Sequence, residues 1–126
     1  MPPLVLRHAP TVALRCAIVD DNPEFLEAAR SLLERQGLSV VGLVSDASDA
    51  VERVHELTPD VALVDLDLRG ASGFDLARRL SDMPVILISA YAEDDFAELV
   101  ESSPAAGFLS KADLSRRAIS ELLEAR

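Results

Sequence analysis

Two aspartates end a short hydrophobic run at residues 60–70, which read DVALVDLDLRG. Asp65 follows directly on Val-Ala-Leu-Val, and Asp67 comes two residues later. Such a run is typical of a buried strand, in which an unpaired carboxylate would be costly. Asp65 therefore either marks the point where the strand reaches water or lies beside a positive charge.

Other polar residues that could act with Asp65 also follow apolar runs. They are Asp20 and Asp21 after the first run, Ser89 at the end of another, and Lys111, the only lysine among twelve basic residues. Singly, each could be a helix cap, a turn residue or a solvated charge. Clustered carboxylates repel one another unless a cation joins them, and a hard divalent ion suits oxygen ligands. A carboxylate beside that ion can act as a nucleophile towards phosphorus, while a hydroxyl and an ammonium stabilise the phosphoryl oxygens.

Five apolar runs alternate with helix-like segments, and this alternation predicts where the polar residues meet. The expected strands are residues 13–20, 39–44, 61–65, 84–89 and 107–109. The expected helices are residues 22–37, 46–57, 73–80, about 93–102 and 113–126, with Asp113 as the cap of the last. Strands buried on both faces and joined by helices imply a parallel sheet covered on each side. The ligand site of such a doubly wound α/β sheet lies at the carboxyl ends of its strands.

Composition and charge limit the classes of function. The chain of 126 residues has the length of one domain, and we expect a tail over residues 1–12 and one domain over residues 13–126. The net charge of −10 argues against a nucleic-acid-binding surface, which needs clustered Lys and Arg. The apolar runs are too short to span a bilayer. The only cysteine, Cys16, excludes an internal disulfide and fits a buried strand and a cytoplasmic location.

The polar residues, in this order, resemble those of the receiver domain of a two-component response regulator, from about residue 14 to the end. VDDNP resembles the family's acidic pair, DVALVDLDLRGASG its phosphoacceptor segment, ILISA its switch hydroxyl, and GFLSK its switch aromatic residue and lysine. The resemblance implies a flavodoxin-like (βα)₅ fold with five parallel strands in the order 2-1-3-4-5.

The resemblance also implies a role for each residue of the pattern. Asp65 would be the phosphorylated residue, with Gly73 as the paired glycine. Asp21 and Asp65 would bind Mg²⁺ through side-chain oxygens, Asp20 through water, and Asp67 through its backbone carbonyl. Lys111 would contact the phosphate, and Ser89 with Phe108 would form the switch.

The family takes its phosphoryl group from phosphohistidine on a sensor histidine kinase or a phosphotransfer protein. By resemblance, this domain would be a signalling domain that catalyses only its own phosphorylation and dephosphorylation. The fourth helix, fifth strand and fifth helix would form the output surface and the interface of a homodimer. We expect no contact of this chain with nucleic acid or membrane.

Two positions depart from the family pattern. Arg69 stands where proline is common, and Ala112 follows Lys111 where proline is frequent, so the Lys111–Ala112 peptide is expected to be trans. This pattern resembles regulators that carry a C-terminal helix-turn-helix of the nitrate or quorum-sensing type. The sequence leaves open whether the receiver stands alone or is the front half of such a regulator.

Two alternatives belong to other classes. VALVDLDLRG also resembles the first motif of haloacid-dehalogenase-type phosphatases, although Leu68-Arg69 replaces the usual Gly-Thr. In addition, the acidic pair precedes the nucleophile in this sequence, whereas in those enzymes the acidic pair follows the nucleophile. The second alternative is a pseudo-receiver, a binding module of the same fold that is never phosphorylated, and the complete acidic set with Lys111 argues against it.

Overall fold

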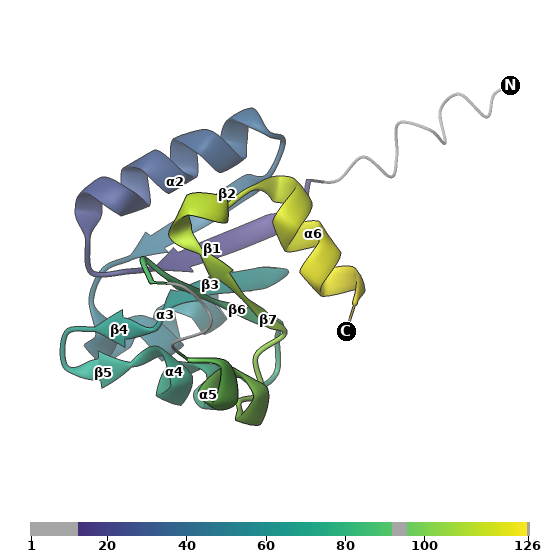
Figure 1. The fold of residues 1–126 in the computed structure, drawn as a ribbon. Helices are drawn as coiled ribbons and strands as arrows, with labels where there is room; N and C mark the ends of the chain where they lie inside the picture. The colour runs from purple at the N-terminus through teal and green to yellow at the C-terminus, as the bar shows by residue number, and fades with distance from the viewer. Residues whose placement is uncertain (1–12, 92–95, 126) are drawn as a thin grey trace, which may run out of the picture.

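The computed structural model describes residues 13–91 and 96–125, which form a central parallel sheet covered by helices (Figure 1). The strands of this sheet are β1 (Arg15–Val19), β2 (Ser39–Val44), β3 (Val61–Asp65), β6 (Val85–Ser89) and β7 (Gly107–Ser110), in the order β2-β1-β3-β6-β7. The predicted parallel sheet is confirmed. The predicted order 2-1-3-4-5 is only partly matched. The five strands of this sheet follow it, but two further short strands, β4 (Asp67–Leu68) and β5 (Ala71–Ser72), come between β3 and β6 in the chain. These two strands were not predicted and form a separate antiparallel pair.

The α-helices of the described residues are α2 (Pro23–Arg35), α3 (Ala50–Leu57), α4 (Gly73–Arg79), α5 (Ala97–Ser102) and α6 (Arg116–Glu124). The predicted cap of the last helix was wrong. Ser115 caps α6 by accepting the N–H of Ala118, whereas Asp113 lies in a 3₁₀ turn at Lys111–Asp113. The predicted tail (1–12) and residues 93–95 of the predicted acidic helix lie outside the described residues.

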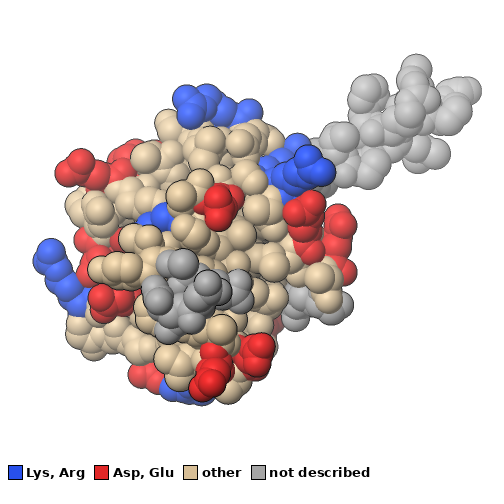
Figure 2. All heavy atoms as spheres, in the orientation of Figure 1, with Lys and Arg blue, Asp and Glu red and all other residues tan. Residues whose placement is uncertain are grey.

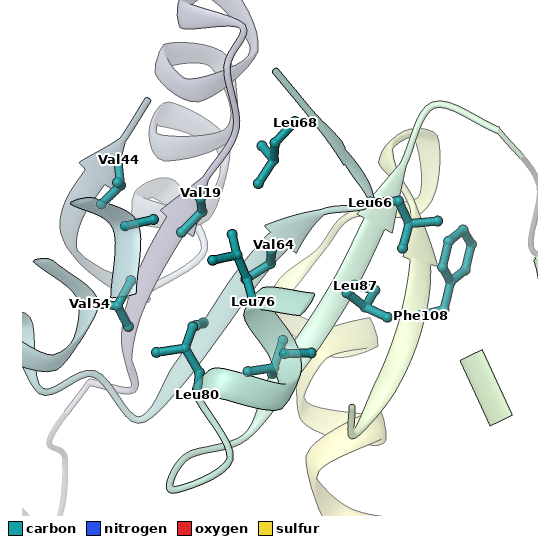
Figure 3. Packing of buried hydrophobic residues seen from close by; sticks show 14 residues of the cluster. Val19, Val44, Val54, Val64, Leu66, Leu68, Leu76, Leu80, Leu87 and Phe108 are labelled. Atoms are coloured by element: carbon teal, nitrogen blue, oxygen red, sulfur yellow. The ribbon is translucent and has the colours of Figure 1, made fainter. Parts of the chain in front are cut away.

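The sheet separates two hydrophobic layers. The layer under α3 and α4 contains Val54, Leu76 and Leu80 together with Val64 and Leu87 of the sheet (Figure 3). The layer on the opposite face is built from α2 and α6 against the other side of the strands. Both faces of β3 and β6 are thus covered, which explains their uninterrupted apolar sequences.

Helical spacing in the sequence predicts a buried stripe of Phe25, Ala29, Leu32 and Leu33 on α2, and the structure differs from it in part. Leu26, Ala29 and Leu33 are buried, while Phe25 and Leu32 are only half-buried. The helix is therefore rotated so that Phe25 lies at the border of the core rather than inside it.

Cys16 lies on β1 between β2 and β3, with no exposed surface. Burial raises the pKa of its thiol to about 12, because the charged thiolate would lose its hydration there. The interpretation of Cys16 as a small apolar residue of a buried strand is confirmed.

The surface carries more acidic than basic side chains. On the face seen in Figure 2, the basic side chains stand apart from one another and acidic ones are spread between them. Among the described residues, none of the helices has the length and apolar character that crossing a bilayer requires.

Candidate functional site

The predicted site residues follow the ends of neighbouring parallel strands. Asp20 comes directly after β1, Asp65 is the last residue of β3, and Lys111 comes directly after β7. Since carboxyl ends of parallel strands meet at one edge of the sheet, these segments converge. Carboxylate oxygens of Asp20, Asp21 and Asp65 all lie within 4.8 Å of one another.

The Lys111 ammonium lies among these carboxylates. Its Nζ atom is 2.6 Å from Asp20 Oδ2 and 3.6 Å from Asp65 Oδ2, so the lysine is closer to Asp20 than to the predicted phosphoacceptor. The same Nζ lies 4.3 Å from the ring centroid of Phe25, within the range of a cation–π contact. Sequence reasoning missed this role of Phe25, because its helical spacing marked it only as a core residue.

Asp20 is fully buried, and its two oxygens are satisfied unequally. Oδ1 accepts the backbone N–H of Asn22 at 2.8 Å. Oδ2 is also buried and, although close to Lys111 Nζ, receives no hydrogen bond of good geometry within the described part of the chain. A buried carboxylate oxygen in this state is a group that a further cation would stabilise.

The electrostatics of Asp65 also favour a further cation at this site. Burial, and secondly the negative charge of Asp20, raise the pKa of Asp65 from 3.8 to about 6. Lys111 and the backbone N–H of Asp67 act against this rise without cancelling it. Negative charge is therefore in excess at this edge of the sheet, and the three carboxylates fit a hard divalent cation such as Mg²⁺.

Asp21 is held by the loop that follows Asp65. Its Oδ2 accepts the backbone N–H of Arg69 at 3.0 Å, and Nε of Arg69 lies 3.8 Å from the same oxygen. Arg69 and Gly70 form the turn between β4 and β5, and Gly70 adopts φ +78°, a conformation that glycine tolerates well. The sequence marked Arg69 only as a departure from proline, which has no N–H to donate.

Of the predicted switch residues, Ser89 lies on β6, the strand beside Asp65, and Phe108 lies one strand further away, on β7. Asp65 pairs with Ile88, so the buried Ser89 is the next residue along β6, and its Oγ accepts the N–H of Tyr91 at 3.0 Å. Phe108 pairs with Leu87 and is only 7% exposed, with its ring beside Leu66 and Leu87 (Figure 3).

The side chain of Asp67 is exposed at the start of β4. Its predicted role as a ligand through the backbone carbonyl stays a prediction. No cis peptide bond occurs among the described residues, so the Lys111–Ala112 bond is trans, as expected.

Gly73 begins α4 directly against the Asp65 backbone, and we expect Gly73→Ala to damage the site. A Cβ atom at this position would overlap the backbone oxygen of Asp65 and lie 2.8 Å from Cα of Leu66. The strand end must then shift, and overpacking of this kind costs about 1–3 kcal/mol. Urea unfolding should show the loss of stability, and the amide NMR signals of Asp65 and Leu66 should move.

Gly70→Ala is the control for that experiment, because a Cβ there meets no atom within 4 Å and only the backbone is strained. It should lose stability without moving the Asp65 signal. Wild-type stability and an unmoved Asp65 signal in Gly73→Ala would contradict the close approach of Gly73 to the Asp65 backbone.

Comparisons with known proteins cover most of the chain. Residues 16–124 match the family described as the response regulator receiver domain. The DNA-binding transcriptional activator EvgA of Escherichia coli K12 is 28% identical over 102 residues, which are 78% of this chain and 50% of EvgA. The transcriptional regulatory protein LiaR of Bacillus subtilis is 32% identical over 103 residues, which are 78% of this chain and 49% of LiaR. The chain thus spans about half the length of these curated relatives.

Solved structures agree with this match. A two-component response regulator of the LuxR family from Aurantimonas sp. SI85-9A1 superposes with a TM-score of 0.80 at 29% identity, covering 91% of this chain and 88% of that one. The response regulator domain of Thermotoga maritima CheB gives a TM-score of 0.73 at 27% identity, covering 90% and 93% of the two chains. These matches favour the receiver over the phosphatase and pseudo-receiver alternatives. The chain belongs to the response regulator receiver domain family, whose members are the receiver domains of two-component response regulators.

Proposed function

We propose that this receiver domain accepts a phosphoryl group on Asp65 from phosphohistidine of a sensor histidine kinase or a phosphotransfer protein. The observation that carries the proposal is the convergence of Asp20, Asp21 and Asp65 within 4.8 Å, beside the only lysine of the chain. A pKa of about 6 leaves the Asp65 carboxylate mostly ionised at pH 7, so it is available as a nucleophile.

Side-chain oxygens of Asp21 and Asp65, with the backbone carbonyl of Asp67, would hold Mg²⁺, and Asp20 would act through water. The bound ion supplies positive charge that offsets the carboxylates and the incoming phosphoryl oxygens. An Asp65 oxygen forms the new bond to phosphorus while the phosphorus–nitrogen bond of the donor breaks, and the released imidazole takes up a proton. Lys111, whose ammonium is 3.6 Å from Asp65 Oδ2, would donate to a phosphoryl oxygen.

Ser89 would read the phosphorylated state. Its hydroxyl can keep accepting the Tyr91 N–H while donating its own proton to a phosphoryl oxygen. Phe108 is already buried in this structure, and burial of the ring is worth on the order of 1–3 kcal/mol. Phosphorylation would therefore bias an equilibrium that the unphosphorylated domain already samples, rather than create a new state.

The output would pass through the surface formed by α5, β7 and α6, which is also the surface that we propose for a homodimer. EvgA is a DNA-binding regulator, and by analogy this receiver would control an output of that class in a cytoplasmic protein. Hydrolysis of the aspartyl phosphate by the domain itself would end the signal.

The test is an intact mass after treatment with acetyl phosphate. With Mg²⁺ the wild type should gain one phosphoryl group, and with EDTA it should gain none. Asp21→Ala should also gain none while keeping its fold, as circular dichroism can verify, because a side-chain ligand of the ion is lost. Phosphorylation that is independent of Mg²⁺ and of Asp21 would contradict the proposed metal site.

A further inference from the structure

The metal ligand that we propose at Asp21 already has a positively charged neighbour. Asp21 Oδ2 accepts the Arg69 N–H at 3.0 Å and lies 3.8 Å from Arg69 Nε. The two residues are 48 positions apart in the chain, so the contact exists only in the folded domain. The Arg69 side chain is 91% exposed, whereas that of Asp21 is 26% exposed. The guanidinium thus lies on the solvent side of the carboxylate.

From this arrangement we propose that Arg69 competes electrostatically with the divalent cation for Asp21, and so sets the cation concentration at which the site fills. The proposal rests on the proposed function, in which the cation binds Asp21. Without the cation, the guanidinium offsets part of the Asp21 charge. With the cation bound, two positive groups face one carboxylate and repel each other, which weakens binding.

The two contacts of Arg69 can be separated by substitution. The N–H belongs to the backbone, and every residue except proline keeps it. Changes from Arg69 to Lys, Ala or Glu therefore alter the charge beside Asp21 and leave the backbone hydrogen bond available. A purely structural role of the turn would not order these variants by charge.

The experiment is a titration of the unphosphorylated protein with MgCl₂, followed by calorimetry and by the amide NMR signals of Asp21 and Asp65. Arg69→Ala should bind Mg²⁺ about two- to fivefold more tightly than wild type, since charge pairs at exposed positions are weak. Arg69→Glu should bind more tightly still, and Arg69→Lys should stay within about twofold of wild type. In 0.5 M KCl these differences should shrink, because salt screens exposed charges.

Arg78→Ala is the matched control, since it removes the same charge from an exposed arginine that pairs with Asp75 on α4. It should titrate like wild type. Equal Mg²⁺ affinities of Arg69→Ala and Arg78→Ala, or an order of the Arg69 variants that does not follow charge, would overturn the proposed role of Arg69. Neither result would affect the proposed metal site. Absence of any Mg²⁺-dependent shift at Asp21 and Asp65 in wild type would instead overturn the proposed metal site, and this inference with it.

Discussion

We expect the Asp65→Asn variant to take up no phosphoryl group from acetyl phosphate at any Mg²⁺ concentration. Asparagine keeps the shape of the side chain, but its amide has no carboxylate oxygen that could attack phosphorus. Intact mass should therefore show one added phosphoryl group in wild type and none in the variant. A group retained by Asp65→Asn would mean that another residue is the acceptor.

The same variant should be more stable than wild type when metal is absent. Ionised Asp65 is disfavoured in the fold, because burial and the Asp20 charge raise its pKa from 3.8 to about 6. At pH 7 most of the unfavourable charge is present, and its removal should add on the order of 2 kcal/mol to the free energy of unfolding.

The difference in stability between Asp65→Asn and wild type should depend on pH. From about pH 7 upwards Asp65 is charged in nearly all folded and unfolded molecules, so the destabilisation is almost complete. As the pH falls from 6 towards 4, the folded state takes up the proton first and the gap between wild type and Asp65→Asn should close. Urea unfolding in EDTA across this range measures the gap. A gap that widens on acidification would contradict the raised pKa.

Lys111→Ala should cause the second large effect, a loss of about 2–3 kcal/mol in the metal-free stability, because it leaves the buried Asp20 carboxylate without its cation. Asp20 has no exposed surface, and the Lys111 Nζ is 2.6 Å from its Oδ2. Phosphorylation of this variant should also be impaired, since no ammonium remains to contact the phosphoryl oxygens.

A double-mutant cycle checks the electrostatic cause. Adding Asp20→Asn to Lys111→Ala removes the unpaired charge and should restore most of the lost stability in EDTA. Mg²⁺ should rescue the Lys111→Ala single variant more than it rescues the double variant. If Asp20→Asn and Lys111→Ala destabilise independently and additively, the stability of the domain does not depend on their pairing.

The sequence predicted the sheet and the convergence of its polar residues, because both follow from local patterns. The strands at residues 39–44 and 61–65 were predicted with their observed ends, and the acidic residues follow strands that are neighbours in the sheet. Parallel order and burial on both faces leave few other places for these side chains.

What the sequence did not predict depends on contacts between distant segments. Nothing near Arg69 indicates that its N–H reaches Asp21, 48 residues away. The β4–β5 pair is too short for its alternation to be recognised. The preference of Lys111 for Asp20 over Asp65 depends on distances of 2.6 and 3.6 Å, which no residue pattern specifies.

The buried thiol on β1 offers a way to measure how often the domain opens. Cys16 is the only cysteine, it lies on a strand with a neighbour on each side, and its pKa of about 12 leaves almost no thiolate at neutral pH. Only the thiolate reacts with alkylating reagents at a useful rate, so labelling must await exposure of the strand to water. The rate of alkylation therefore reports how often rare openings of the domain expose β1, the strand that leads into the acidic pair. Ions or phosphoryl groups that stabilise the closed domain would slow the alkylation of Cys16. The measurement needs no dye or added tag.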